Sequence, residues 1–176
     1  FLEEQKEDNS MKVEFIDYDY KDTFDAVEGQ NGLKMAMAVA VAGHHNLMVC
    51  GSPGCGKTMM LHKLPLLIPK LLPDEQMSTN RIWSLAGLSK NGEIRTERPF
   101  RIPHQTASIE GICGGGPNCR PGEISLAHNG VLFLDEAAEF RSSVLQMLRY
   151  PLENHTITMS RAGRSTVYPA HFQLVM

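Results

Sequence analysis

The sequence predicts an α/β fold in which a parallel sheet is covered by helices on both faces. Three short runs of mainly apolar residues, at 46–50, 131–134 and 172–176, are separated by stretches with helical character. Such runs are expected for strands that are buried on both faces of a parallel sheet. Because strands that alternate with helices form βαβ units, we expect three layers, with the sheet in the middle.

Composition fits one globular domain. The chain has 176 residues, a net charge of −3 and 42% hydrophobic residues. This charge argues against a globally basic nucleic-acid binder, although it leaves room for a local basic face. No apolar run reaches the roughly 18 residues that span a membrane, and the polar, acidic first residues are unlike a signal peptide. We therefore expect a cytoplasmic protein with no membrane partner.

The four cysteines, Cys50, Cys55, Cys113 and Cys119, are expected to be free thiols in a reducing compartment. A disulfide at Cys55 would constrain a loop that must enclose a ligand. A metal or disulfide site at Cys113 and Cys119 is the alternative, but the local sequence supplies no further ligands.

Helix caps and prolines divide the first half of the chain into separate predicted helices and loops. Residues 1–22 are rich in charged residues and tyrosine and are predicted to be a linker or arm, with 13–16 as a candidate edge strand. Helices are predicted over 31–42, 58–64 and 75–86. Pro65, Pro69 and Pro73 prevent one continuous helix, and Asp74 is the expected cap of the third. Residues 87–97 are predicted to be a loop.

The second half is predicted from apolar runs and turn residues. A short strand is expected over 100–103, and helical segments over 106–112, 123–128 and 142–149. The Gly- and Pro-rich stretch 114–122 is predicted to be an exposed loop. Two alternating runs, 156–161 and 165–168, flank Ala162-Gly163 and predict a β-hairpin.

A phosphate-binding loop follows the first apolar run. Gly51, Gly56, Lys57 and Thr58 match the pattern Gly-x-x-x-x-Gly-Lys-[Ser/Thr] between a predicted strand and a predicted helix. Glycines let the backbone N–H groups turn toward phosphates, Lys57 would reach the β- and γ-phosphates, and Thr58 offers Mg²⁺ an oxygen ligand. The predicted nucleotide-binding residues of this segment are Gly51, Ser52, Pro53, Gly54, Cys55, Gly56, Lys57, Thr58 and Met59.

Two carboxylates follow the second apolar run. Asp135 and Glu136 come directly after 131–134, so they are expected at the carboxyl edge of the sheet, where ligands bind in open α/β folds. Asp135 is the predicted Mg²⁺ partner of Thr58. Glu136 is predicted to activate the water that attacks the γ-phosphate, and Lys57, Asp135 and Glu136 are the predicted catalytic residues.

Several longer segments resemble one family. Together with the phosphate loop, they resemble the magnesium-chelatase-like AAA+ ATPases, a P-loop NTPase family, and within it the YifB/ComM-like subgroup. The similarity begins near Phe24, and the segment 120–136 is far more specific than a phosphate loop alone. The segments are 43–49, 98–104, 120–136 and 169–175.

The resemblance implies further roles and partners. It places Val27 and Gln30 near the adenine base, makes 114–122 an insertion in the second helix of the fold, and makes 156–168 a pre-sensor hairpin. It also implies ATP and Mg²⁺ as ligands and a ring, commonly a hexamer. In the ComM-like branch the implied activity is DNA branch migration, and Arg161 and Arg164 of the hairpin are candidate DNA contacts. Solvated hairpin charge is an equally weighted reading of these arginines.

Departures from the family pattern limit what the resemblance implies. We expect residues 23–176 to be an ATPase core taken from a longer protein, because the Lon-like domain, the lid, the sensors and the arginine finger are not in the sequence. Cys55 replaces a more usual threonine, and Ala137-Ala138 replaces Leu-Pro. Two functional alternatives stay open: a magnesium chelatase motor subunit acting on a porphyrin-holding partner, and a nucleotide-dependent binding switch.

Overall fold

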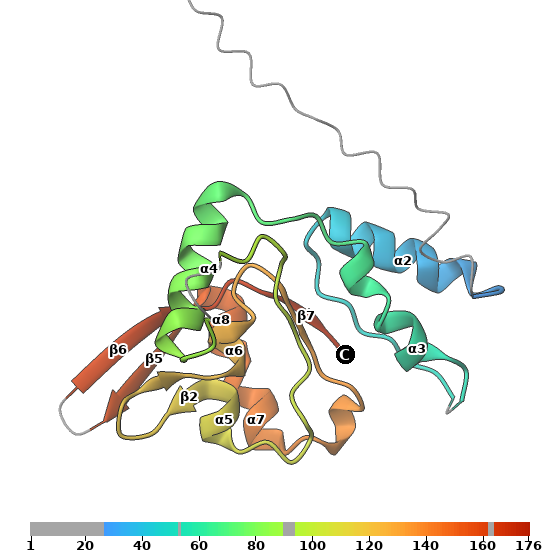
Figure 1. Ribbon diagram of the computed structural model, residues 1–176. Coiled ribbons are helices and arrows are strands. Elements are labelled where there is room, and N and C mark those ends of the chain that lie inside the picture. Colours follow the sequence, from blue (N-terminus) through green and yellow to red (C-terminus); the bar gives the residue numbers. More distant parts are fainter. Residues whose placement is uncertain (1–26, 53, 90–93, 162–163) are drawn as a thin grey trace, which may run out of the picture.

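The computed structural model describes residues 27–176 except 53, 90–93 and 162–163. The predicted linker at 1–22 and the candidate edge strand at 13–16 lie outside the described residues. The centre of the fold is a parallel sheet of β1 (Phe100–Arg101), β4 (Val131–Phe133) and β7 (Gln173–Val175), in the order β1-β4-β7 (Figure 1). The register pairs Phe100 with Val131, and Leu132 with Leu174. The predicted parallel sheet is therefore confirmed.

The first predicted strand, 46–50, extends the sheet but is not buried. Leu47 forms a single parallel bridge with Val175, and the Val49 N–H donates to the Met176 carbonyl at 2.8 Å. Met48 and Cys50 are exposed. Within the described chain this segment pairs with β7 on one side only, so its other edge stays open. The predicted burial was wrong for that reason, while the predicted parallel direction is confirmed.

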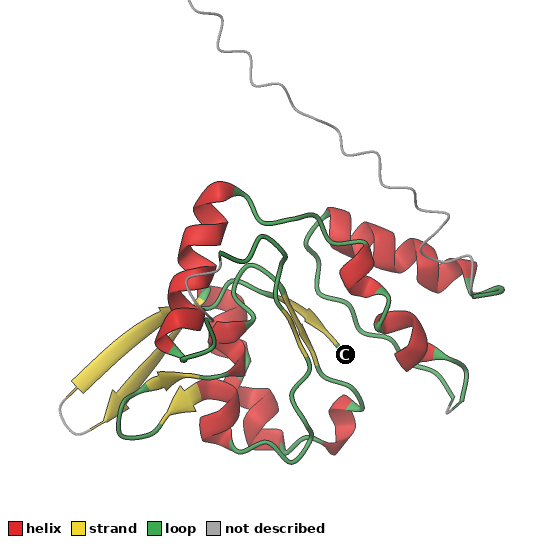
Figure 2. Ribbon diagram, viewed as in Figure 1, coloured by secondary structure: helices red, strands yellow, loops and turns green. Residues whose placement is uncertain are grey.

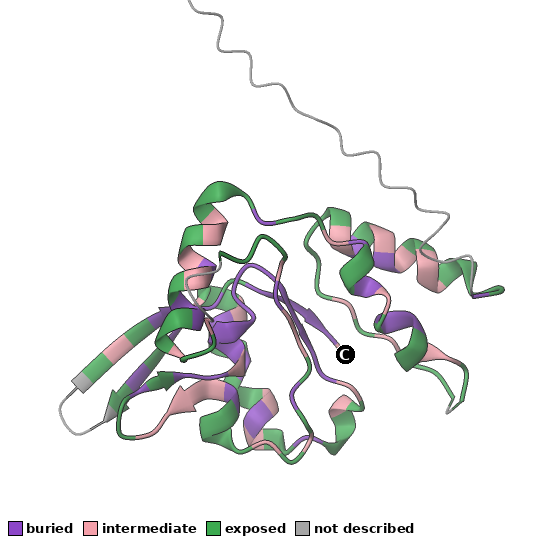
Figure 3. Cartoon of the chain, in the orientation of Figure 1, coloured by how far each residue is buried: buried purple, intermediate pink, exposed green. Residues whose placement is uncertain are grey.

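Alternate side chains of the central strands pack on opposite faces of the sheet. Val131, Phe133 and Val175 lie in one core with residues of α2 (Asn31–Ala42) and α3 (Lys57–Leu61). Leu132 and Leu174 lie in a second core on the other face. Figure 2 shows α2 and α3 on one side of the sheet and the remaining short helices on the other, and Figure 3 shows that β4 and β7 between them are buried, while β1 is half-buried. These two cores confirm the three-layer arrangement.

The first three α-helices lie where they were predicted, except for the end of the second and the cap of the third. Helix α2 has the predicted bounds, but α3 stops at Leu61 and is followed by the short 3₁₀ helix η1 (Leu64–Leu66). Helix α4 (Pro73–Leu85) begins with a proline at its first position and Leu72 as its cap, not Asp74. The Leu72 N–H donates instead to the Glu75 carboxylate at 2.8 Å.

The helices of the second layer are short. They are α5 (Ile109–Cys113), α6 (Glu123–Leu126), η2 (Ala137–Glu139), α7 (Ser142–Met147) and α8 (Arg149–Asn154). Helix α5 begins later than predicted because the Ser108 hydroxyl accepts the Gly111 N–H at 3.0 Å and caps it there. Helix α4 joins this layer, since the Trp83 indole N–H donates to the Leu126 carbonyl at 3.1 Å.

The Gly-rich stretch 114–122 is not the exposed loop that was predicted. It forms a small antiparallel pair, β2 (Gly114–Gly115) with β3 (Arg120–Pro121), and Cys119, Pro121 and Gly122 are buried. A Cβ at Gly122 would lie 2.2 Å from the Gly114 nitrogen. Glycine at this position therefore permits a close contact between two backbone segments, which a composition-based prediction of a loop overlooks.

The predicted hairpin is confirmed as β5 (Thr156–Arg161) and β6 (Arg164–Pro169), which project from one side of the molecule (Figure 1). Its inner face is buried at Ile157, Met159 and Tyr168, and the Tyr168 hydroxyl donates to the Cys119 carbonyl at 2.9 Å. The hairpin is thus anchored to the β2–β3 pair. Among the described helices, none is long and apolar enough to cross a membrane.

Candidate nucleotide site at the carboxyl edge of the sheet

The phosphate loop lies where the 46–50 segment ends and α3 begins. Gly54 and Gly56 have φ values of 77° and 81°, in the left-handed region that favours glycine. The Lys57 ammonium donates to the Gly51 carbonyl at 2.7 Å and to the Ser52 carbonyl at 2.8 Å. Pro53 lies outside the described residues. The loop thus encloses its own lysine, which supplies positive charge where phosphates would bind.

One cavity of about 610 Å³ unites the two sequence motifs. This volume is within the range of small-molecule sites. Its wall includes residues of the phosphate loop, the acidic pair and the two neighbouring strand ends: Met48, Val49, Cys50, Gly51, Gly54, Gly56, Lys57, Thr58, Met59, Leu61, Phe133, Asp135, Glu136, Ala137, Ala138 and Met176.

Thr58 and Asp135 meet inside this cavity. The Thr58 hydroxyl donates to an Asp135 carboxylate oxygen at 3.1 Å, although the two residues are 77 positions apart. Thr58 is exposed and Asp135 is half-buried. Two hard oxygen donors beside a phosphate loop form the kind of ligand set that Mg²⁺ accepts in addition to phosphate oxygens. The donor set therefore fits the predicted metal.

Glu136 is held by a residue that the sequence reasoning missed. The Gln105 side-chain amide donates to a Glu136 carboxylate oxygen at 2.6 Å. Gln105 follows the short strand β1, which is the neighbour of β4, so both residues leave the same edge of the sheet. Glu136 itself has a φ of 53°, unusual for a residue with a side chain. Asp135 and Glu136 were predicted at the carboxyl edge of the sheet because they follow a strand. Gln105 follows the predicted strand 100–103 and could have been predicted there for the same reason.

The two residues expected near the base lie apart from the cavity wall. Val27 is buried in the core between α2 and α3, and its carbonyl accepts the Lys34 ammonium at 2.5 Å. Gln30 is the cap residue of α2, and its amide donates to the Cys55 carbonyl in the phosphate loop. The structure therefore brings Gln30, but not Val27, into contact with the predicted nucleotide-binding loop.

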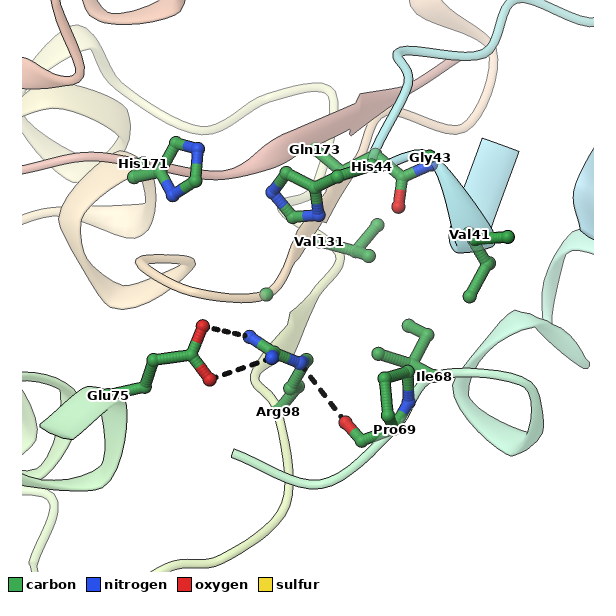
Figure 4. Close-up of a pocket in the computed structure, with 12 residues that line it drawn as sticks. Val41, Gly43, His44, Ile68, Pro69, Glu75, Arg98, Val131, His171 and Gln173 are labelled. Carbon is green, nitrogen blue, oxygen red and sulfur yellow. Dashed lines mark hydrogen bonds and ion pairs between the residues drawn. The ribbon is translucent and has the colours of Figure 1, made fainter. Parts of the chain in front are cut away.

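A second cavity, of about 480 Å³, lies at the opposite edge of the sheet, beside the beginning of β4 (Figure 4). Arg98 crosses it and is only 14% exposed. Its guanidinium donates to both Glu75 carboxylate oxygens at 2.7 and 3.0 Å, to the Pro69 carbonyl at 3.1 Å and to the Asn129 carbonyl at 2.7 Å. Burial alone would raise the pKa of Glu75, but the hydrogen bonds from Arg98 and the Leu72 N–H outweigh it and lower that pKa.

Three histidine rings gather beside this arginine. The His171 ring centre lies 4.9 Å from that of His44 and 4.5 Å from that of His155. Burial lowers the pKa of His44 and His171, and it lowers the pKa of His128 to about 4. His128 Nδ1 accepts the His171 backbone N–H at 3.1 Å. His44, His128 and His171 are therefore neutral at pH 7. The contacts among the histidines hold together residues that are distant in sequence.

No metal cluster is formed by these side chains. Within the described ranges, no group of three or more His, Cys, Asp or Glu residues is placed to hold a metal ion. The four cysteines are free, as predicted from the sequence. Arg98 and the histidines make hydrogen bonds and ring contacts between segments at this edge, and the predicted catalytic residues lie at the other edge of the sheet.

Comparison with known proteins decides the family. The family described as "Magnesium chelatase, subunit ChlI" matches residues 23–176. The chain belongs to the magnesium chelatase family. Within it, the chain is 44% identical over 167 residues to competence protein ComM of Haemophilus influenzae, covering 94% of this chain and 33% of that protein. It is 42% identical over 160 residues to the uncharacterized protein YifB of Escherichia coli, covering 91% of this chain and 31% of that protein.

The solved structures agree on the fold of this family member. The BchI subunit of magnesium chelatase, in a complex of BchI with BchD, superposes with a TM-score of 0.66 at 23% identity, covering 87% of this chain and 53% of that one. This likeness confirms the P-loop NTPase fold of the AAA+ type. The chain spans about a third of the length of ComM and YifB, so the resemblance to the YifB/ComM-like subgroup is confirmed for this part of those proteins.

Proposed function

We propose that this member of the magnesium chelatase family binds Mg²⁺ and ATP and hydrolyses ATP, as the core of an AAA+ motor. One observation carries the proposal: a single cavity collects the Lys57 ammonium, the Thr58–Asp135 oxygen pair and the Glu136 carboxylate. Positive charge for phosphates, oxygen ligands for a metal and a base for water are the three groups that phosphoryl transfer requires. The nucleotide-binding core corresponds to residues 23–176 and the linker to 1–22.

Phosphate binding is assigned to the loop and its lysine. In the resting structure Lys57 is bound to the carbonyls of Gly51 and Ser52. We infer that incoming phosphates attract the ammonium from these neutral carbonyls, because a negatively charged phosphate adds Coulomb attraction to the hydrogen bond. The backbone N–H groups of the loop complete the proposed phosphate site.

Thr58 and Asp135 are the residues that would hold Mg²⁺, Thr58 through its hydroxyl and Asp135 through its carboxylate. When bound, the metal neutralises charge on the phosphate oxygens during transfer. The 3.1 Å hydrogen bond between the two side chains supports this assignment, because it brings both oxygen donors together.

Hydrolysis is assigned to Glu136 as the base. Its carboxylate would accept a proton from water while the water oxygen bonds to the γ-phosphorus and the bond to the β-phosphate oxygen breaks, which releases ADP and phosphate. The Gln105 amide donates to the same carboxylate at 2.6 Å and therefore orients it. A carboxylate on the surface with no such partner would be free to rotate in solvent, whereas this hydrogen bond fixes the orientation of Glu136.

The assembled protein is proposed to be a cytoplasmic ring, a hexamer, that acts on DNA. The match to a competence protein supports DNA as the substrate, and the β5–β6 hairpin is the proposed contact because its turn is flanked by Arg161 and Arg164. The second candidate is a chelatase motor that acts on a porphyrin-holding partner, which is favoured by the fold of BchI in its complex with BchD. A nucleotide-dependent switch is disfavoured because Glu136 is in place.

The test of nucleotide binding uses Lys57→Ala in the full-length protein. Wild type is expected to bind ATP with Mg²⁺. The affinity of the variant for ATP is expected to be lower by a factor of roughly a hundred or more, because a charged hydrogen-bond partner of the phosphates is removed. Titration of a fluorescent ATP analogue measures both. Equal affinity in the two proteins would contradict the proposal, and release of phosphate with and without DNA separates the motor from the switch.

A further inference from the structure

Gln30 touches the phosphate loop from outside it. The residue caps the amino end of α2 with a φ of 52°, and its carbonyl accepts the Lys34 N–H at 3.1 Å in the first turn of that helix. Its side-chain amide donates to the Cys55 carbonyl, 25 residues further along the chain. The amide also packs against Gly56, where a Cβ would lie 3.3 Å from the Gln30 nitrogen. A helix of the first layer is therefore tied to the loop by one side chain.

The position of the Cys55 carbonyl determines where the next N–H points. A trans peptide is planar, so its C=O and N–H groups point in opposite directions. Because Gln30 holds the Cys55 oxygen on its own side, the N–H of Gly56 is directed away from Gln30. Gly56 lines the nucleotide cavity. The hydrogen bond therefore presents this N–H to a phosphate and keeps a carbonyl oxygen, which phosphates would repel, turned outward.

The carbonyls at the start of the phosphate loop and the Cys55 carbonyl near its end accept hydrogen bonds from different kinds of donor. Lys57 holds the carbonyls of Gly51 and Ser52, but it is also the group that phosphates attract. Gln30 is uncharged, has no such competing partner and can keep its hydrogen bond while the lysine moves. We propose that Gln30 is a positioning residue that orients the Cys55–Gly56 peptide for phosphate binding, rather than a contact to the base. This inference rests on the proposed nucleotide site.

The experiment compares two ligands, one of which lacks a base. ADP and inorganic tripolyphosphate are titrated into wild type and two variants: Gln30→Met, which keeps the side-chain length but has no donor, and Gln30→Glu, which replaces the donor with an acceptor. The matched control is Gln76→Met, because the Gln76 amide also donates to a backbone carbonyl, that of Leu71 at 2.9 Å, but far from the loop.

Gln30→Met is expected to weaken the binding of ADP and of tripolyphosphate by the same factor, roughly tenfold. This loss of affinity follows when one hydrogen bond no longer positions the loop. Gln30→Glu should weaken both further, because its carboxylate faces a carbonyl and lies near the phosphates. Gln76→Met should match wild type. If Gln30→Met weakens ADP but leaves tripolyphosphate unchanged, Gln30 contacts the base and the proposal is overturned; no change for either ligand also overturns it.

Hydrogen–deuterium exchange separates failure of this inference from failure of the proposed function. If wild type binds neither ligand, the proposed function fails, and the positioning role is judged in the ligand-free protein. There, residues 54–57 should exchange faster in Gln30→Met than in wild type and Gln76→Met. Equal exchange in all three proteins would overturn the positioning role, whatever the outcome of the titrations.

Discussion

The two edges of the central sheet differ in how their polar groups are satisfied. At the carboxyl edge, Thr58 and Glu136 are exposed, and each makes one side-chain hydrogen bond among the residues that the structure describes, so both retain capacity for a ligand. At the opposite edge, the Arg98 guanidinium has four hydrogen bonds and is mostly buried. A cavity is present at both edges. We assign ligand binding and catalysis to the carboxyl edge, and we assign the joining of the layers to the opposite edge.

This difference separates the expected effects of mutations. Substitutions at the carboxyl edge should change binding or turnover and leave the free energy of unfolding nearly unchanged. Substitutions at the opposite edge should do the reverse, because those groups join α4, the turn before β4 and the start of β7.

The largest expected effect is on turnover. Glu136→Gln keeps the shape of the side chain but cannot accept a proton, so kcat should fall by roughly 10²–10⁴-fold, the usual contribution of a general base. ATP affinity and the melting temperature should stay within the error of wild type. Steady-state phosphate release by the full-length protein, with binding measured in parallel, checks both. A variant that melts at a much lower temperature would show that this edge is structural after all.

The opposite edge is tested by Arg98→Met. The change removes the Arg98 donor from the Glu75 carboxylate, which keeps its bond from the Leu72 N–H, and from two carbonyls, so the free energy of unfolding should fall by about 2–4 kcal/mol. The control is Arg149→Met, whose partner Glu153 lies at 3.2 Å in an exposed pair; it should cost less than about 0.5 kcal/mol. Denaturant unfolding of the three proteins measures the difference. Equal losses in both variants would contradict the assignment of Arg98 to the structural edge.

Two glycine substitutions, one at each edge of the sheet, test the difference between the edges. A Cβ at Gly130, next to β4 at the structural edge, would lie 2.0 Å from the Pro99 carbonyl oxygen, so Gly130→Ala should destabilise the fold by about 1–3 kcal/mol. Gly54 has nothing within 4 Å, and Gly54→Ala meets only the local cost of its φ of 77°. Gly54→Ala should weaken ADP binding and cost less stability than Gly130→Ala, as measured by titration and thermal unfolding.

The smallest effect expected is on pH dependence. Burial lowers the pKa of His44, His171 and His128, the last to about 4, so the folded state binds their protons more weakly than the unfolded chain. Stability contributed by these neutral rings is complete above about pH 6.5 and is lost as the pH falls toward 4. Denaturant unfolding between pH 7 and pH 4 should show this decline, and His128→Asn should reduce it. The same decline in both proteins would exclude His128 as a cause.

Burial sets the sign of this effect, and the nearby charged groups modify its size. Arg98 repels protons at His44 and His171, while Glu75 attracts them and opposes the shift. Because burial is the largest cause for each ring, the net direction is a lowered pKa. Arg98→Met should therefore ease protonation of His44 and His171 slightly, in addition to its larger effect on packing.

Much of the fold could be predicted because its signals are local. Helix α2 ends where glycine follows an apolar helical pattern, the hairpin strands are two alternating runs close together in sequence, and β4 is a run of buried apolar residues between a turn and two acids. The same reasoning was wrong at 114–122, where glycines allow a close backbone contact rather than an exposed loop, and at 46–50, where an unpaired edge leaves the strand exposed.

The sequence by itself determined which residues are predicted to act at the carboxyl edge, because phosphate, metal and water require particular residue types at spacings that one strand and one loop can supply. Lys57, Thr58, Asp135 and Glu136 were all predicted in this way, and they line one cavity. Tertiary structure alone decided which residues hold these groups in place. The contacts of Gln105 with Glu136, Gln30 with Cys55 and Arg98 with Glu75 join segments 23 to 31 residues apart. Such contacts depend on strand order and helix packing, which no local pattern specifies.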